Sequence, residues 1–270
     1  MSVNRRTVLA AAPMAAVAGA ARAAPLGDKP PFILIHGTWL GGWIWADVAA
    51  RLRAGGHVVH TPSLTGLGDR AHLASPEVGL ETHINDITAI IDCEEMTDVI
   101  LVAQSFSGIA ATGALDRRRA QVRHIAFFDG LIPAGDRMSG IETDAEGREL
   151  PSFTKRRAEF IDGYLMDFFK SYPMQMLVSD DHPEIQARLR RRITPHPARG
   201  WTDRLRLENG GWEGVPRSSI RCMGQIFAPS SERMWGPSRA PGWNNIDLDF
   251  GRMGMLTDPD MVADALLSLA

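Results

Sequence analysis

Residues 99–108 read VILVAQSFSG, an apolar run that ends in two serines and a glycine. The β-branched residues at its start predict a short buried strand ending at Ala103, and the residues from Phe106 to about Arg119 predict a helix. Ala103 and Ser107 stand two positions before and after Ser105, where small side chains allow a strand and a helix to meet in a sharp turn. Such a turn exposes the Ser105 hydroxyl at the positive end of a helix, either as a catalytic nucleophile or as a helix N-cap.

A second motif, IHGTWLGGWIW at residues 35–45, follows an apolar strand predicted over residues 32–35. A glycine-rich loop at this place supplies a backbone N–H that stabilises the negative oxygen formed in acyl transfer. The other donor is the N–H of the residue after the nucleophile, so we expect the amides of Thr38 and Phe106 to form an oxyanion hole. This second motif favours the nucleophile interpretation of Ser105. We interpret His36 as a residue that shapes the loop, with a general base as the alternative.

Three residues are candidate substrate contacts: Trp39 in the glycine-rich loop, Gln104 just before Ser105, and His196 in the sequence Thr-Pro-His-Pro. Trp39 shares its loop with Trp43 and Trp45, and we expect at least two of these indoles to pack a helix against the sheet instead. His196 is a candidate because its segment is predicted to lie over the pocket.

The wider pattern alternates apolar strands with amphipathic helices, which is typical of a parallel sheet covered by helices on both faces. We therefore expect an α/β fold with a mostly parallel central sheet. Residues from about 133 to 216 are richer in charge and carry no clear strand, so they predict a helical cap, with helices over residues 156–169 and 185–192. Further strands are expected over residues 57–60, 122–128, 219–223 and 246–250, and helices over residues 43–54, 80–95 and 258–269, the last beginning with an acidic N-cap at Asp258.

The composition narrows the range of functions. The chain has 270 residues, of which 44% are hydrophobic and 23% are charged, as in an ordinary globular domain. A net charge of −3 and the lack of a basic run argue against a nucleic-acid partner, so we expect a small-molecule substrate. Cys93 and Cys222 form no metal-ligand spacing, and we expect both to be buried thiols rather than a disulfide. No metal, nucleotide or flavin motif is present, so no cofactor is expected.

The N-terminus predicts an export signal. Arg5 and Arg6 form a twin-arginine pair, an apolar run follows over residues 8–18, and Ala21-Arg22-Ala23 is a small-x-small cleavage site. The apolar run is shorter than the roughly 20 residues that span a bilayer, so we expect no stable membrane insertion. The predicted signal is residues 1–23, and the predicted mature domain is residues 24–270, located in the periplasm or secreted.

Together these motifs resemble the α/β-hydrolase superfamily, in particular small esterases of the plant methylesterase, hydroxynitrile lyase and pyrethroid-hydrolase type. The resemblance rests on the loop at residues 36–45, PSLTGLGDR at 62–70, residues 83–86, the turn around Ser105, and FDGLIP at 128–133. It covers nearly all of the mature chain, is strongest over residues 32–133 and is weak in the cap. It implies an α/β-hydrolase fold with Ser105 at its nucleophile elbow.

The chain departs from this pattern where the partners of the serine should be. The resemblance places the acid a few residues beyond Cys222, where the chain has Gln225, and the histidine just after the last strand, where it has Arg252. No histidine follows His196. Arginine stays protonated and cannot act as a base, and a serine without a base is a weak nucleophile. Asp129, at the end of the strand after the elbow helix, is a possible replacement acid, since some relatives take their acid from there.

Three functions remain open at this point. The first is a divergent exported hydrolase of small carboxylic esters or lactones that uses Ser105. The second is a non-hydrolytic enzyme (a lyase, isomerase or cyclase) in which Arg252 binds an anion, because a fixed cation beside an oxyanion hole stabilises a carboxylate or enolate. The third is a catalytically inactive protein that binds a small molecule.

Overall fold

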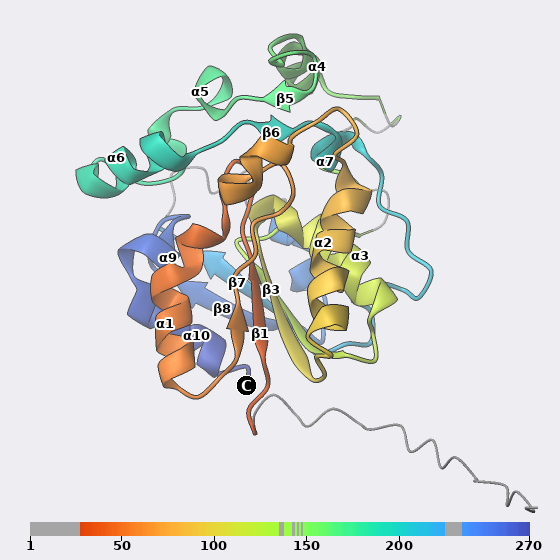
Figure 1. Cartoon of the computed structure of the whole chain (residues 1–270), viewed down its shortest axis with the longest axis vertical. Coiled ribbons are helices and arrows are strands. Elements are labelled where there is room, and N and C mark those ends of the chain that lie inside the picture. The colour runs from red at the N-terminus through yellow and green to blue at the C-terminus, as the bar shows by residue number, and fades with distance from the viewer. Residues whose placement is uncertain (1–27, 135–137, 142–143, 145, 147, 225–233) are drawn as a thin grey trace, which may run out of the picture.

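The central element is a six-stranded sheet in which every strand pairs in parallel with its neighbours. The computed structural model describes residues 28–134, 138–141, 144, 146, 148–224 and 234–270 (Figure 1). The strand order is β2-β1-β3-β4-β7-β8. The strands are β1 (Phe32–Ile35), β2 (Val59–His60), β3 (Val99–Gln104), β4 (Val122–Phe128), β7 (Arg217–Cys222) and β8 (Asn244–Leu248). This is the expected parallel α/β architecture.

Helices cover both faces of the sheet because successive strand residues point to opposite sides. In β1, Phe32 and Leu34 pack with one set of helices, while Ile33 and Ile35 pack with the other. The first set is α1 (Ala46–Ala54), α9 (Gly254–Thr257) and α10 (Pro259–Leu267), and the second is α2 (Leu80–Cys93) and α3 (Gly108–Arg117) (Figure 1). Short 3₁₀ turns are η1 (Gly42–Trp45), η2 (Gly68–Leu73), η3 (Ser105–Ser107), η4 (Met174–Met176) and η5 (Gly236–Arg239).

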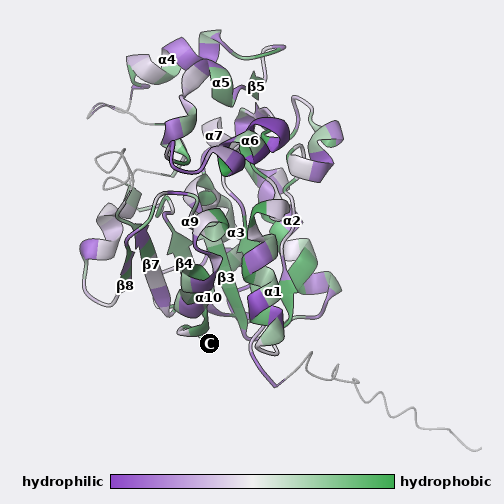
Figure 2. Ribbon diagram, turned by 90° about the vertical axis from the view of Figure 1, so that its left-hand side faces the viewer, coloured by the Kyte–Doolittle hydropathy of each residue, from purple (hydrophilic) through white to green (hydrophobic). Residues whose placement is uncertain are grey.

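The segment between β4 and β7 lies over the end of the sheet where the parallel strands finish (Figure 1). It contains α4 (Pro151–Ala158), β5 (Leu165–Met166), α5 (Phe168–Ser171), α6 (Pro183–Arg192), β6 (His196–Pro197) and α7 (Arg199–Thr202). Its helices α4 and α6 are more hydrophilic than strands β3 and β4 (Figure 2). We refer to the described residues of this segment, between 138 and 216, as the cap.

The cap differs from the expectation in two ways. The prediction of a single helix over residues 156–169 was wrong. Helix α4 ends at Ala158, and Asp162 and Gly163 adopt left-handed backbone angles before β5 begins. The cap also contains two short strands that the sequence does not indicate, β5 and β6, which pair in antiparallel fashion. Both differences arise because a charged segment of short elements lacks the long apolar periodicity from which helices are recognised.

Two smaller expectations also need correction. Asp258 is the N-cap residue of α10, but its side chain makes no capping hydrogen bond. Cys93 is exposed near the end of α2 rather than buried, whereas Cys222 is buried at the end of β7. No disulfide joins these two described cysteines.

Candidate active site

The turn from β3 into α3 holds Ser105 in a left-handed backbone conformation, with φ of 55°. A non-glycine residue in this region is unusual, and such strain is typical of functional turns. The turn is held by neighbours: the Leu131 N–H donates to the Ser105 carbonyl at 2.8 Å, and the Ser107 hydroxyl donates to the Gln104 carbonyl at 2.9 Å. A side chain at Gly108 would overlap the Leu131 carbonyl, so only glycine fits there. Ser105 itself remains partly exposed.

The glycine-rich loop lies directly against this turn. A Cβ atom at Gly37 would come within 2.9 Å of the Ser105 Cβ. The loop can approach the turn this closely because Gly37 has no side chain. The Gly37 N–H donates to the Gln104 side-chain oxygen at 2.5 Å. Gln104 is buried, and the structure therefore places this predicted substrate contact against the loop backbone. Thr38, whose amide is a predicted oxyanion donor, follows directly.

His36 connects the glycine-rich loop to the neighbouring loop at residues 62–70. The Leu64 N–H donates to Nε2 of His36 at 3.0 Å, so the proton of the neutral ring sits on Nδ1 and is donated to the Gly37 carbonyl at 2.8 Å. The ring is fully buried, and burial lowers its pKa to about 4. With both nitrogens occupied, the arrangement fits a residue that shapes the loop.

The buried neutral state of His36 predicts a pH-dependent stability. In the unfolded chain its pKa is about 6.5, so between pH 6.5 and 4 the unfolded state binds more protons and the free energy of unfolding falls as the pH falls. The loss attributable to His36 is about 3 kcal/mol at full extent. Urea unfolding at pH 7, 5.5 and 4.5 measures it, with His36→Asn as control. If the free energy of unfolding fell equally steeply with pH in the wild type and in His36→Asn, His36 would not be the group that titrates.

A buried ion pair joins Arg252 and Asp129, which lie far apart along the chain. The Nε atom of Arg252 donates to a carboxylate oxygen of Asp129 at 2.7 Å. The Asp129 side chain is 0% exposed and the Arg252 side chain 7% exposed. Asp129 follows β4 with φ of 43°, and its N–H donates to the Ile220 carbonyl at 2.7 Å. The possible acid and the residue at the expected histidine position thus lie in direct contact.

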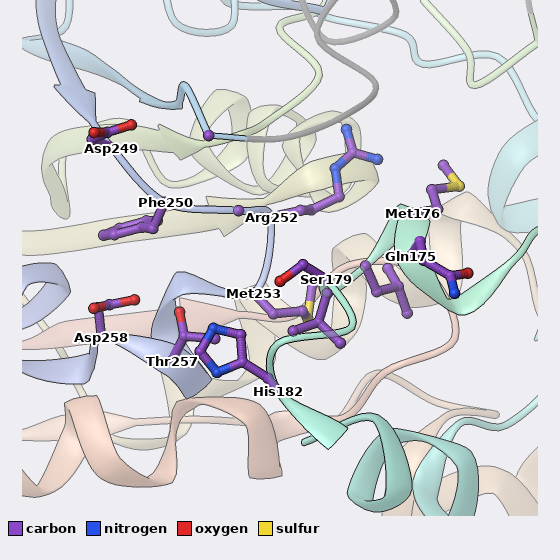
Figure 3. A pocket seen from close by; sticks show the side chains of 14 residues that line it. Gln175, Met176, Ser179, His182, Asp249, Phe250, Arg252, Met253, Thr257 and Asp258 are labelled. Atoms are coloured by element: carbon purple, nitrogen blue, oxygen red, sulfur yellow. The ribbon is translucent and has the colours of Figure 1, made fainter. Parts of the chain in front are cut away.

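A cavity of about 250 Å³ lies beside Arg252, between the cap and the loop that follows β8. Figure 3 shows its lining, with the Arg252 guanidinium turned away from His182 and Thr257. His182 and Ser179 come from the cap, and Asp249 and Asp258 from the C-terminal segment. Ser105 does not line this cavity. It is therefore a hollow next to the ion pair, separate from the elbow.

Aromatic side chains of the cap pack against the glycine-rich loop and the elbow. Trp39, with φ of 65°, is 4% exposed, and its indole N–H donates to the Met166 carbonyl at 2.9 Å. Its ring meets those of Phe168 and Tyr172 edge to face. The environment of Trp39 is thus one of close packing between the loop and the cap.

His196, on strand β6, is brought to the neighbourhood of the elbow. Its ring lies edge to face with that of Phe106, with centroids 5.8 Å apart, and 5.6 Å from the ring of His83. Among the described residues, neither of its ring nitrogens has a hydrogen-bond partner. Burial holds the pKa of His196 well below its usual value, so the ring is neutral at pH 7.

The structure therefore gathers the predicted residues into two groups. Ser105, Phe106, Thr38 and Gln104 meet at the elbow, with Trp39 and His196 packed beside them, while Asp129 and Arg252 form the ion pair. Gln225 and the predicted signal, residues 1–23, lie outside the described residues.

One residue of the elbow region was missed from the sequence. Trp201, in α7, donates its indole N–H to the Thr38 hydroxyl at 3.0 Å and stacks on Phe106. No local motif marks it, because Thr38 lies 163 positions away along the chain.

Two features are absent from the described residues. No cluster of His, Cys, Asp or Glu side chains there has the arrangement of a metal site. Within the same part of the chain, no helix has both the length and the apolar character needed to cross a membrane.

The chain matches known proteins over most of its length. The sequence profile described as the alpha/beta hydrolase family matches residues 32–265. A carbendazim-hydrolyzing esterase from Nocardioides sp. (strain SG-4G) is 32% identical over 250 residues, which covers 88% of this chain and 98% of the esterase.

Solved structures show the same fold. An extracellular alpha/beta-hydrolase from a Paenibacillus species superposes with a TM-score of 0.72 at 23% identity, covering 89% of this chain and 98% of that one. A pyrethroid hydrolase from Sphingobium faniae superposes with a TM-score of 0.67 at 19% identity, covering 89% and 96%. At these identities the superpositions establish the fold alone.

Proposed function

The chain belongs to the alpha/beta hydrolase family and is esterase-like, and from this we propose that it hydrolyses small carboxylic esters or lactones with Ser105 as nucleophile. In this proposal the amides of Thr38 and Phe106 hold the oxyanion. The observation that carries it is the elbow itself: a strained, partly exposed Ser105 with the glycine-rich loop packed against it at Gly37.

The chemistry starts with attack of the Ser105 oxygen on the carbonyl carbon, while the hydroxyl proton passes to a solvent water molecule. Two backbone N–H groups aimed at the developing oxyanion stabilise that step, and each such donor contributes roughly 10²- to 10³-fold in kcat. The C–O bond to the leaving group then breaks, and the leaving group departs with the electron pair. The acyl group then resides on Ser105 until water displaces it.

Proton transfer is the distinctive part of the proposal. Arg252 does not accept the serine proton, because a guanidinium offers donors and no acceptor and its Nε already donates to Asp129. Without an ordinary histidine beside the serine, reactivity has to come from the substrate. We therefore propose substrates that are already activated, namely aryl esters, whose phenolate departs without a proton, and strained lactones.

The experiment is a turnover panel of 4-nitrophenyl acetate, phenyl acetate, ethyl acetate and the strained β-butyrolactone, with the acid products measured by mass spectrometry. We expect aryl esters and the lactone to be turned over and ethyl acetate to be the slowest. Tight binding of these compounds without product would instead support a catalytically inactive binding protein, and no turnover of any of them would end the hydrolase proposal.

A second candidate is a non-hydrolytic enzyme that binds an anion at Arg252. The observation in its favour is that Asp129 fixes the guanidinium in one orientation in a buried place. The same contact also weakens it, because the carboxylate offsets the positive charge that an anionic ligand would meet. This candidate requires activity that survives Ser105→Ala better than Arg252→Ala, and the opposite ranking removes it.

We also propose that residues 1–23 are a twin-arginine export signal. The paired arginines, the short apolar run and the Ala21-Arg22-Ala23 site support this. Protein recovered from the periplasm is expected to begin at Ala24 by N-terminal sequencing. An uncleaved chain retained in the cytoplasm of a host with an active twin-arginine pathway would contradict it.

A further inference from the structure

Trp201, in the cap, contacts both residues whose amides are the proposed oxyanion donors. Its indole N–H donates to the Thr38 hydroxyl at 3.0 Å. Its ring stacks almost face to face on that of Phe106, with centroids 4.8 Å apart and planes 9° from parallel. The two residues that it contacts lie on different segments, one in the loop after β1 and one in the elbow after β3. Trp201 therefore connects the two segments from the side of the cap.

The surroundings hold Trp201 firmly in this place. The Gly140 N–H donates to the Trp201 carbonyl at 2.9 Å, and a Cβ atom at Gly140 would come within 2.9 Å of the indole ring. Gly200, the preceding residue, lies against the buried rings of His83 and His196, where a side chain would come within 2.7 Å of the His196 Nε2. Phe153, on α4, stacks 6.3 Å from the same indole. Glycines on both sides thus allow a close approach that fixes the indole relative to the sheet.

We propose that Trp201 is a positioning residue that sets the geometry of the oxyanion hole by fixing Thr38 and Phe106 relative to each other. This inference rests on the proposed function. Oxyanion donors act only when they point at the place where the charge develops, and small displacements of positioned groups are costly. The hydrogen bond fixes the Thr38 side chain, and the stacked ring fixes the Phe106 side chain. Through these contacts the cap and the catalytic turn are coupled.

The test removes the two contacts separately. Trp201→Phe keeps an aromatic ring over Phe106 but loses the N–H donor, and Thr38→Val removes the acceptor with little change in shape. Each is expected to lower kcat for 4-nitrophenyl acetate about tenfold with KM within twofold, because the oxyanion interaction exists only in the transition state. The double variant should lose no more than either single variant, since both remove the same hydrogen bond.

The matched control is Trp243→Phe. Trp243 is a half-buried indole that packs against Phe127 and Trp212, and among the described residues its N–H has no partner to lose. This variant should keep kcat within twofold of the wild type. Phosphonylation of Ser105 by a serine-reactive phosphonate gives a second readout, because it also forms a charged oxygen in the hole. Its rate should fall with kcat in Trp201→Phe, while the melting temperature stays close to that of Trp243→Phe.

Two failures can be told apart. If the wild type neither turns over esters nor reacts with the phosphonate, the proposed function fails. If the wild type reacts but Trp201→Phe and Trp243→Phe behave alike, or if the losses of Trp201→Phe and Thr38→Val multiply in the double variant, the positioning role of Trp201 is wrong and the proposed function stands.

Discussion

Replacing Ser105 by alanine is expected to lower kcat/KM for an aryl ester by about 10³-fold or more. Loss of the serine from a complete triad costs about 10⁶-fold in kcat. The sequence predicts Arg252 at the position of the base, so under the proposed function part of that advantage is absent from the start and we expect a smaller loss. The remaining rate comes from the oxyanion hole and substrate binding, which Ser105→Ala leaves in place.

Backbone strain at Ser105 calls for a second variant. Alanine is disfavoured at φ of 55°, whereas glycine adopts this angle freely. Ser105→Gly is therefore the matched control: both variants lack the hydroxyl, but only alanine carries the strain. We expect equal losses of activity and a higher melting temperature for the glycine variant. Activity retained in Ser105→Gly alone would show that strain, not chemistry, explained the alanine result.

Replacing Asp129 by asparagine is expected to cost about 3 kcal/mol of unfolding free energy. Removing one charge from a buried ion pair takes away the counter-charge that this contact gives the other group in a low-dielectric place, and breaking such a pair costs about 3–5 kcal/mol. Asparagine keeps the shape and tolerates the left-handed backbone at this position, so the charge is the main change. Urea unfolding measures the loss.

Asp92→Asn is the control variant, in which the same substitution is made in an exposed ion pair. Asp92 pairs with Arg118 at 2.6 Å, but both side chains are substantially exposed, at 46% and 32%. Exposed pairs contribute about 0–1 kcal/mol, so this variant should lose little. The double variant Asp129→Asn/Arg252→Met removes the buried cation as well and should recover part of the loss. Equal losses for Asp129→Asn and Asp92→Asn would show that the pair between Asp129 and Arg252 is not held in a buried setting.

The elbow and the glycine-rich loop were predictable because their chemistry is local. Ala103, Ser105 and Ser107 lie within five consecutive residues, and the turn that they form depends on small side chains at fixed spacing. The parallel sheet was predictable for a related reason: strands buried on both faces leave apolar runs that are visible in a single sequence. Strand β4 was predicted with the bounds that the structure shows, Val122–Phe128.

The cap was the less predictable part. Its elements are short, and β5 and β6 contain two residues each, too few to leave a periodic signal. Contacts between distant segments carry no local signal either. Asp129 and Arg252 were each named from their places along the chain, but their pairing across 123 positions emerges only from the fold. Trp201 was missed because its partner Thr38 lies in another segment and because its neighbours in the sequence are mostly charged or polar.

The most direct test of the central claim is the mass of the protein after reaction with a serine-reactive phosphonate, followed by peptide mapping. We predict one adduct, carried by the peptide that contains Ser105 and absent from Ser105→Ala and Ser105→Gly. An unmodified wild-type protein, or an adduct on a different residue that persists in both variants, would contradict the account of Ser105 as the nucleophile.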